Sequence, residues 1–268
     1  MKVIVIGGVA GGASAAARVR RLDAKAEVIV LEKGRDASFS NCCLPYHLSH
    51  TIEESSSLVM MTPEKFKKQH DIDVRVRHEA VEIKREEKKV VIRDLQNQNT
   101  YTETYDKLIL APGASPILPA GIVGIHRSHV HVIRNVEDIE RLRAAIDRRD
   151  CTDIAVIGGG FIGVETAENL SLAGKHVTLV EGSNQIMTPF DHDIVQILHK
   201  ELDDHGVDVW LDSMLTAVEE KHIVVTQRKE QHRLKADAVV MAIGVAPQTK
   251  LAKEAGLKIG ETGGIWVN

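Results

Sequence analysis

Short apolar runs and stretches of small residues alternate at the start of the chain. The run Lys2–Ile6 predicts a buried strand, the stretch from about Gly11 to Leu22 predicts a helix, and the run Glu27–Glu32 predicts a second strand. Unbroken apolar runs of this length are typical of strands covered on both faces, as in a parallel sheet. The pattern therefore predicts a strand–helix–strand unit of the α/β class.

The same order of elements occurs once more in the second half of the chain. There the pattern predicts a strand at Asp153–Ile157, a helix from about Gly163 to Ala173, and a strand at His176–Glu181. The sequence contains no short-period repeat and no low-complexity tract, so this pair of units is its one internal duplication.

Two later runs, Asp106–Gly113 and Ala236–Gly244, share an acidic residue, an apolar stretch and a closing glycine. This repeated pattern predicts that the chain leaves one domain after the first run, forms a second domain, and returns to the first domain after the second run. The other predicted elements are a helix near Thr62–His70, strands at Asp73–Ile83 and Lys89–Arg93, a polar turn near 96–100, an irregular linker over 114–135, a helix near Val136–Arg148, and strands at Asp208–Leu211 and His222–Gln227.

The predicted fold is α/β, with two Rossmann-like domains of which the second is inserted into the first. We expect the first domain to cover residues 1–115 and the inserted domain to cover 116–238. Residues 239–268 then return in part to the first domain.

A glycine-rich turn follows the first strand of each unit, over residues 7–12 and 158–163. Glycine lets the backbone approach a pyrophosphate, and the next helix points free N–H groups and its positive dipole end at that phosphate. Glu32 and Glu181 close the second strands, where a carboxylate accepts hydrogen bonds from ribose hydroxyls. Two such sets, each with strand, glycine turn, helix and acid in order, predict two dinucleotide sites.

Glu181 also indicates which nicotinamide the second site takes. A 2′-phosphate at this position would face a carboxylate, and such a like-charge contact costs several kcal/mol. The next residues, Gly182, Ser183 and Asn184, offer no arginine for that phosphate. The sequence therefore favours NADH over NADPH.

Composition and charge exclude several other classes of function. The chain has 268 residues, is 43% hydrophobic and 27% charged, and carries a net charge of −4. This balance argues against binding to nucleic acid, and no apolar run approaches the length of a membrane span. With only three cysteines there is no disulfide framework, which favours a reducing cytoplasm.

A cysteine pair, Cys42 and Cys43, follows Glu32 closely in the segment 38–46 and returns toward the first glycine turn. Pro45 suits the first turn of a helix, whose dipole would favour a reactive thiolate just ahead of it. Cys151 has no motif around it and is expected to be structural. His126, His129 and His131 lie in the irregular connector without metal-ligand spacing, so no metal site is predicted.

Taken together, these motifs resemble the single-cysteine branch of the flavin-dependent pyridine nucleotide-disulfide oxidoreductases, and most of all coenzyme A-disulfide reductases and NADH-dependent persulfide reductases. The motifs in question are the two glycine turns, Ser-Phe-Ser-Asn-Cys-Cys-Leu-Pro-Tyr over 38–46, Thr-Pro-Glu-Lys-Phe over 62–66, Leu-Ala-Pro-Gly over 110–113, and Ala-Ile-Gly-Val-Ala-Pro-Gln-Thr over 242–249. Cys43 departs from the family pattern, which usually has Gly or Ala there.

The resemblance implies a role for particular residues. Cys42 would be the catalytic redox cysteine. Ser14, Arg18, Arg21, Ser38 and Asn41 would contact coenzyme A as substrate. The implied FAD and NADH contacts are Gly7, Gly8, Val9, Ala10, Gly11, Gly12, Glu32, Lys33, Val81, Ala111, Gly113, Arg134, Gly158, Gly160, Phe161, Ile162, Gly163, Glu181 and Gly244.

The implied reaction moves electrons from NADH through FAD to a small-molecule disulfide or persulfide at Cys42, with Phe161 moving aside as a gate. We expect this chain to be the N-terminal portion of such an enzyme, without the C-terminal dimerisation domain, and the complete family member to be a homodimer.

Two alternatives remain open at this stage. NADH oxidases and peroxidases of the same branch place a histidine where this chain has Ala10, which argues against their chemistry. The second alternative is a catalytically incomplete fragment that binds nucleotides only.

Overall fold

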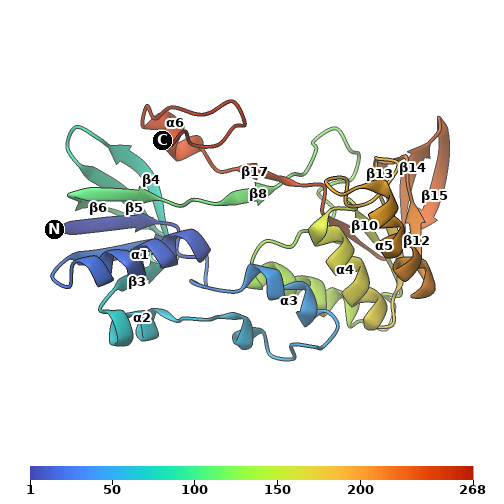
Figure 1. Cartoon of the computed structure of the whole chain (residues 1–268), viewed down its shortest axis with the longest axis horizontal. Coiled ribbons are helices and arrows are strands. Elements are labelled where there is room, and N and C mark those ends of the chain that lie inside the picture. Colours follow the sequence, from blue (N-terminus) through green and yellow to red (C-terminus); the bar gives the residue numbers. More distant parts are fainter. Residues whose placement is uncertain (268) are drawn as a thin grey trace. The chain divides into compact units, whose positions relative to one another are not determined.

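The computed structural model describes residues 1–267, which divide into two compact units (Figure 1). Unit 1 contains Met1–Ser40, Ser56–Ser115 and the chain from Ala246 onward. Unit 2 contains Asn41–Ser55 and Pro116–Val245, so it is inserted into unit 1. The expected domain boundaries placed Cys42 in the first domain, whereas the segment Asn41–Ser55 packs with unit 2.

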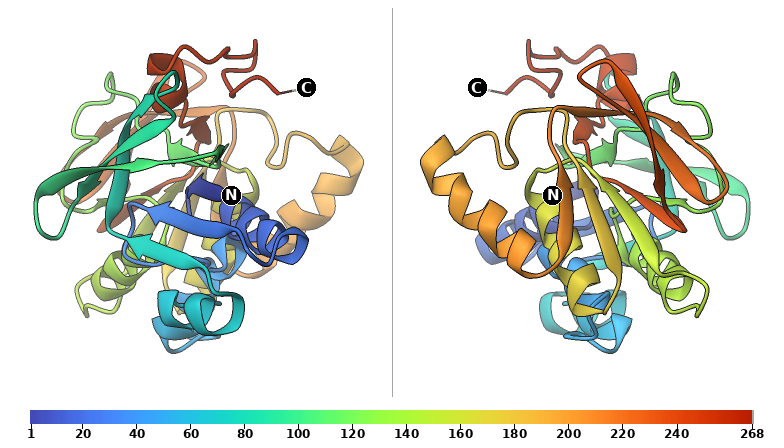
Figure 2. Two further views of the ribbon diagram at one scale, coloured as in Figure 1. Left: turned by 90° about the vertical axis from the view of Figure 1, so that its left-hand side faces the viewer. Right: turned by 90° about the vertical axis from the view of Figure 1, so that its right-hand side faces the viewer.

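A four-stranded parallel sheet in the order β3-β2-β1-β7 forms the centre of unit 1 (Figure 2). The side chains of β1 and β2 alternate between its two faces, so that Val5 and Val30 pack toward α1 while Ile4 and Ile29 pack toward the antiparallel sheet. The elements are β1 (Lys2–Ile6), α1 (Ala10–Leu22), β2 (Glu27–Glu32), α2 (Pro63–His70), β3 (Asp73–Val76) and β7 (Lys107–Leu110). The predicted strands β1 and β2 and the helix near Thr62–His70 are thus confirmed.

The second sheet of unit 1 is antiparallel, in the order β4-β5-β6. The predicted single strand Asp73–Ile83 was wrong, because the chain turns at Arg77, where φ is +57°, and passes from one sheet into the other. The predicted turn at 96–100 was too long, since a strand already begins at Asn99. The strands are β4 (His78–Lys84), β5 (Lys89–Asp94) and β6 (Asn99–Thr104).

Unit 2 repeats this plan with a parallel sheet in the order β12-β11-β10-β16-β9 (Figure 2). Helices α4 and α5 pack against β11 and β12, respectively. Helix α5 was not among the predicted elements. The elements are β9 (Val130–His131), α3 (Val136–Ile146), β10 (Asp153–Ile157), α4 (Phe161–Leu172), β11 (His176–Val180), α5 (His192–Asp204), β12 (Val207–Trp210) and β16 (Ala238–Met241).

An antiparallel sheet of three strands completes unit 2, and its apolar face packs on the parallel sheet through Leu215, Ile223 and Val225. Only its middle strand was predicted. The strands are β13 (Ser213–Val218), β14 (His222–Gln227) and β15 (Glu230–Lys235).

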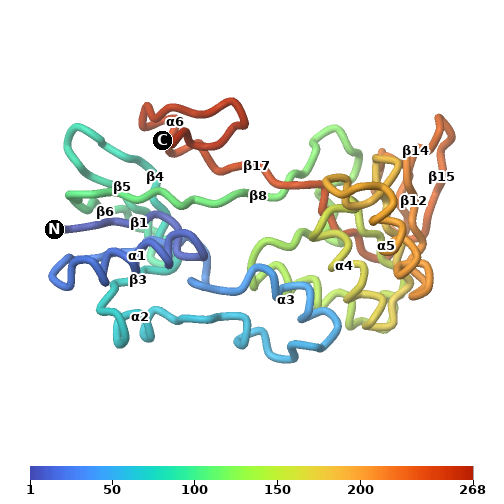
Figure 3. The backbone as a smooth tube through the Cα atoms, in the orientation of Figure 1, coloured from blue at the N-terminus to red at the C-terminus, as the bar shows by residue number. Residues whose placement is uncertain are grey.

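The chain passes between the units through β8 (Ala114–Pro116) and β17 (Val245–Pro247), which pair as a two-stranded sheet (Figure 3). Because β8 and β9 lie within 114–135, the prediction of an irregular linker there was wrong. A short helix, α6 (Lys250–Glu254), follows β17.

An aspartate secures the first strand of each parallel sheet, which explains the repeated acid-then-apolar runs. Asp106 accepts a hydrogen bond from the backbone N–H of Lys2 at 2.6 Å. Asp237 accepts hydrogen bonds from the N–H groups of Thr152 and Asp153 at 3.0 and 3.1 Å, and its carboxylate is 3.0 Å from the ammonium of Lys221. Burial alone would raise the pKa of Asp237, but these donors outweigh it and lower that pKa well below its usual range.

We expect Asp237→Asn to lower the free energy of unfolding by about 1–3 kcal/mol at pH 7, because the two N–H donors and the ammonium of Lys221 lose a charged acceptor. The folded-state pKa of Asp237 is lowered, so its stabilisation is present above the unfolded-state pKa of about 3.9 and is lost as the pH falls below that value. Urea unfolding at pH 7 and pH 3 measures this, with the exposed Asp203→Asn as control. An equal deficit at both pH values would contradict it.

Candidate dinucleotide and thiol sites

The first glycine turn connects β1 to α1 with no room for side chains at two positions. Gly7 has φ of +100°, and a Cβ there would lie 2.0 Å from the carbonyl oxygen of Ala111. A Cβ at Gly12 would lie 1.7 Å from the carbonyl oxygen of Gly7. These two glycines therefore allow the helix to pack closely on the sheet.

The second turn, from β10 to α4, has the same close contacts and one open position. A Cβ at Gly158 would lie 2.5 Å from the carbonyl oxygen of Ala242, and one at Gly163 would lie 1.8 Å from that of Gly158. By contrast, a Cβ at Gly160 meets no atom within 4 Å. Close packing within the fold therefore does not require glycine at position 160. In the first turn the matching position is Val9, which is partly buried.

The helices after these turns begin without a capping side chain. Neither Val9 nor Gly160 supplies a side-chain hydrogen bond, and the first turns of α1 and α4 contain no acidic residue. By contrast, Thr62 caps α2, and Asn135 with Asp138 forms a capping box on α3. The first N–H groups of α1 and α4 thus point into positions where an anionic group is favoured.

Glu32 and Glu181 are held in equivalent ways by backbone N–H groups. Glu32 accepts from Gly8 at 2.8 Å and from Gly34 at 2.7 Å. Glu181 accepts from Gly159 at 2.6 Å and from Ser183 at 2.8 Å. Each carboxylate is therefore fixed beside its own glycine turn and retains lone pairs for further donors such as hydroxyl groups.

The remaining predicted cofactor positions are distributed over both units. In unit 1, the exposed Lys33 donates to Gln248 at 3.2 Å, and Val81 is the extra residue of a β-bulge in β4. In unit 2, the N–H of Arg134 donates to Asp138 at 3.2 Å. The other positions are Ala10 and Gly11 at the start of α1, Ala111 and Gly113 after β7, and Gly244 before β17, where φ is +121°.

The first two residues of α4, Phe161 and Ile162, are exposed by 59% and 38%. The ring of Phe161 makes an edge-on contact with Phe190, with centroids 6.0 Å apart. A large aromatic side chain is thus exposed beside the open position at Gly160, and its predicted role as a gate stays a prediction.

The cysteine pair lies in a single 3-10 turn, Asn41–Cys43, followed by a second one, Pro45–His47. Pro45 does begin a helical turn as predicted, but that turn has only three residues, so the expected helix dipole has no basis. Cys42 is exposed, Cys43 is half-buried and Cys151 is buried; all three thiols are free.

Two helices of unit 2 hold this cysteine segment in place. The guanidinium of Arg143 on α3 donates to the carbonyl oxygen of His47 and also contacts the ring of His50. Ser49 donates to Asn169 on α4 at 2.7 Å. Sequence reasoning missed Arg143 and Asn169, because nothing in their own segments indicates a partner more than 90 residues away.

The predicted coenzyme A contacts also fall in both units. Ser14, Arg18 and Arg21 are exposed on α1, and Ser38 has φ of +47°. These four belong to unit 1, whereas Asn41 belongs to unit 2. Arg20, between the two exposed arginines, is structural because it donates to the carbonyl oxygens of His70 and Asp71 at 2.9 and 2.7 Å.

Other candidate sites in the described chain are weaker. Burial, with the positive charges of His129 and Arg141, lowers the pKa of His131 to about 4.

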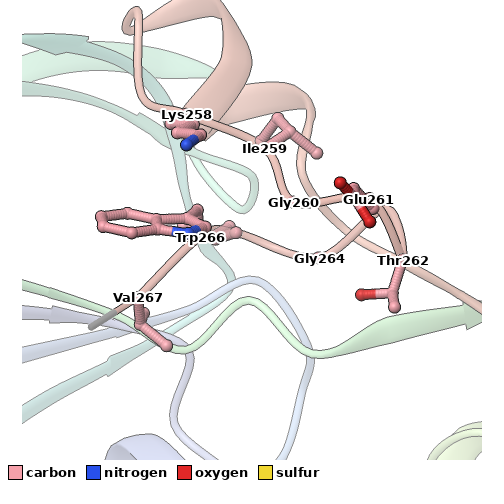
Figure 4. A pocket seen from close by; sticks show the side chains of 9 residues that line it. Lys258, Ile259, Gly260, Glu261, Thr262, Gly264, Trp266 and Val267 are labelled. Atoms are coloured by element: carbon pink, nitrogen blue, oxygen red, sulfur yellow. The ribbon is translucent and has the colours of Figure 1, made fainter.

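Within residues 1–267, no group of three or more potential ligands could hold a metal ion, and no helix has the length and apolar composition to span a membrane. A hollow at 258–267 in unit 1, where Lys258 lies over the ring of Trp266 at 4.7 Å, contains none of the predicted site residues (Figure 4).

Comparison with known proteins identifies the family. The family model described as pyridine nucleotide-disulphide oxidoreductase matches residues 1–268. The chain belongs to this family. Family members are NAD(P)H-dependent flavin oxidoreductases that use FAD, and the resemblance inferred from the sequence is confirmed at this level.

The chain is similar to coenzyme A disulfide reductase of Staphylococcus aureus, with 34% identity over all of this chain and 59% of that protein. It is also similar to the reduced CoADR-RHD of Bacillus anthracis, with 43% identity and a TM-score of 0.93 over 98% of this chain and 47% of that one. The NAD-dependent persulfide reductase of A. fulgidus has 34% identity and a TM-score of 0.94, covering 100% of this chain and 50% of that one. The chain thus spans about half to three fifths of the length of these relatives.

Proposed function

We propose that this chain carries the FAD, NADH and redox-cysteine sites of an enzyme that reduces coenzyme A disulfide or persulfide. The observation that carries the proposal is the duplicated arrangement of glycine turn, uncapped helix and tethered carboxylate, together with the exposed Cys42. The similarity to a coenzyme A disulfide reductase and a persulfide reductase supports the choice of substrate.

The residues of unit 1 fit FAD, and those of unit 2 fit NADH. In this proposal the N-terminal N–H groups of α1 and α4 bind the two pyrophosphates, while Glu32 and Glu181 bind ribose hydroxyls. The bulge at Val81 turns a backbone segment out of the β4–β5 ladder, which supports its assignment as a cofactor contact. When bound, FAD would supply the two-electron carrier between nicotinamide and sulfur.

Cys42 serves as the nucleophile that attacks a sulfur atom of the substrate. Its thiolate attacks the disulfide, forms a mixed disulfide with one half of the substrate and releases the other half as a thiol. Two electrons from NADH and a proton then release the second thiol and restore the Cys42 thiolate. With a persulfide substrate, the product that leaves is sulfide in place of the second thiol.

Coenzyme A carries phosphate groups that need basic contacts. Arg18 and Arg21 are exposed on α1 with Ser14 on the same helix, and neither arginine makes an ion pair in the described chain, so both charges are available to a ligand. Ser38 and Asn41 belong to the same proposed set.

The absorption spectrum of the purified chain tests the proposal directly. We expect a flavin band near ~450 nm that bleaches when NADH is added anaerobically and returns when coenzyme A disulfide follows. Recovery with glutathione disulfide as the control should be much slower, because that substrate lacks the phosphates. A protein that stays colourless after FAD is added would contradict the proposal for this chain and would favour the alternative of a catalytically incomplete fragment.

A second measurement separates the oxidase and peroxidase alternative. The residue at the position of the expected proton donor is Ala10, whose side chain cannot transfer a proton. NADH loss that requires peroxide and proceeds without any coenzyme A substrate would replace our proposal by this alternative.

The choice of nicotinamide depends on Glu181. We expect Glu181→Ala to weaken NADH binding by about tenfold, because two ribose hydroxyls lose a fixed acceptor, and to weaken NADPH binding less or strengthen it, because a repulsive charge is removed. Fluorescence titration with both nucleotides measures this ratio, with Glu220→Ala, an exposed residue between β13 and β14, as control. An unchanged ratio would contradict the assignment.

A further inference from the structure

The cysteine turn contains two free thiols on adjacent residues. Cys42 is exposed and Cys43 is half-buried in the turn Asn41–Cys43. The next residue, Leu44, is buried with 2% exposure, and Arg143 holds the following turn at the carbonyl oxygen of His47. The backbone of the pair is therefore anchored on its C-terminal side, while Cys42 is exposed and Cys43 is half-buried.

Geometry disfavours a direct bond between these two sulfurs. Adjacent Cα atoms in a trans peptide are ~3.8 Å apart, whereas ordinary disulfides join Cα atoms about 4.4–6.8 Å apart. In a 3-10 turn, the side chains of neighbouring residues also diverge by roughly 120°. A disulfide would have to strain the turn, so the two thiols are expected to stay reduced together.

A larger atom placed between the sulfurs does not require them to come within bonding distance of each other. Each cysteine side chain can rotate among three staggered positions, and these rotations change the separation of the two sulfurs. Such an atom must prefer thiolate ligands and form two bonds of fixed angle. Trivalent arsenic meets both requirements.

We propose that Cys42 and Cys43 form a dithiol site for trivalent arsenicals. With an arsenoxide, both S–H bonds and the As–O bond break, two As–S bonds form, and the two protons leave with the oxygen as one water molecule. No electron is transferred, so the step needs no oxidant or reductant.

The arsenical is expected to bind this pair in preference to a single thiol, because the second As–S bond forms within the same chain. Closing this ring raises the apparent affinity over a single thiol by roughly 10²–10⁴-fold. Cys151 lacks a neighbouring thiol and is buried, and this burial raises the pKa of its thiol. It therefore provides an internal control.

The test is intact-mass spectrometry of the reduced native chain after incubation with phenylarsine oxide. We expect one adduct, with the mass of the reagent less one water, which 2,3-dimercaptopropanol removes and an equal concentration of a monothiol does not. Cys42→Ser and Cys43→Ser should each lower the apparent affinity by ~10²-fold or more, while Cys151→Ala retains it. Absence of the adduct, or wild-type affinity in either single variant, would overturn the proposal.

A second measurement uses only the wild-type chain, so misfolding of a variant cannot affect its result. Treatment with phenylarsine oxide should protect both Cys42 and Cys43 from iodoacetamide in peptide mapping, and protection of only one would also overturn the proposal. Because the readouts are mass and alkylation, an adduct on a chain without NADH-dependent activity would support the dithiol site while the proposed reductase function failed alone.

Discussion

Replacing Cys42 by serine is expected to lower the rate of NADH-dependent coenzyme A disulfide reduction by more than ~10³-fold, with flavin still bound. A serine hydroxyl cannot form the mixed disulfide, so the covalent route is lost rather than slowed. The glycine turn proposed to bind FAD belongs to unit 1, whereas Cys42 lies in a turn that packs with unit 2. Loss of the thiol therefore leaves the proposed flavin contacts in place.

Steady-state NADH oxidation and the flavin spectrum of the same preparation measure the two effects separately. Cys151→Ala is the matched control, because Cys151 is buried just before the start of β10 and its thiol takes no part in the proposed reaction. Full turnover by the Cys42 variant would remove this residue from the mechanism. Loss of flavin together with activity would show instead that the substitution disturbs the fold.

Substitution by alanine is expected to change the stability of the protein at one glycine of the second turn and not at another. Gly163→Ala should lower the free energy of unfolding by about 3 kcal/mol or more, because its Cβ would lie 1.8 Å from the backbone oxygen of Gly158 and the helix would have to move off the sheet. Gly160→Ala should leave that free energy within about 0.5 kcal/mol, since φ is −81° and its Cβ meets no protein atom within 4 Å.

NADH affinity should fall in both variants but for different reasons. In Gly160→Ala the methyl group occupies the space proposed for the pyrophosphate, and we expect a loss of affinity on the order of tenfold or more in an otherwise stable protein. Urea unfolding and NADH titration provide the two values. Gly121→Ala, at another open position, is the control. Wild-type NADH affinity in Gly160→Ala would show that the pyrophosphate does not approach this turn.

The buried parallel strands could be predicted from the sequence, because burial on both faces demands continuous apolar runs. Lys2–Ile6, Glu27–Glu32 and Asp153–Ile157 begin and end where the pattern predicts. The glycines and the acids that follow these strands could be predicted for the same reason, since each has a fixed position relative to the strand.

The exposed strands could not be predicted in this way. Strands β6 and β15 consist mainly of polar residues and exist because β5 and β14 offer them a complete ladder of hydrogen bonds. The break at Arg77 likewise depends on which sheet each half joins. Helix α5 differs from these strands, because it could have been predicted. Its apolar residues Val195, Leu198 and Leu202 have the spacing of one face of a helix.

The sequence alone therefore established the α/β class and the two Rossmann-like units, and it located the glycine turns, Glu32 and Glu181 at the ends of the second strands, and the cysteine pair, because local composition and spacing encode all of these. Contacts between distant segments established the rest. Glu32 and Glu181 are fixed by N–H groups of their own glycine turns, and Arg143 and Asn169 hold the cysteine segment from helices far along the chain. No local pattern encodes such pairings, because a hydrogen-bond partner is chosen by the fold that brings the two segments together.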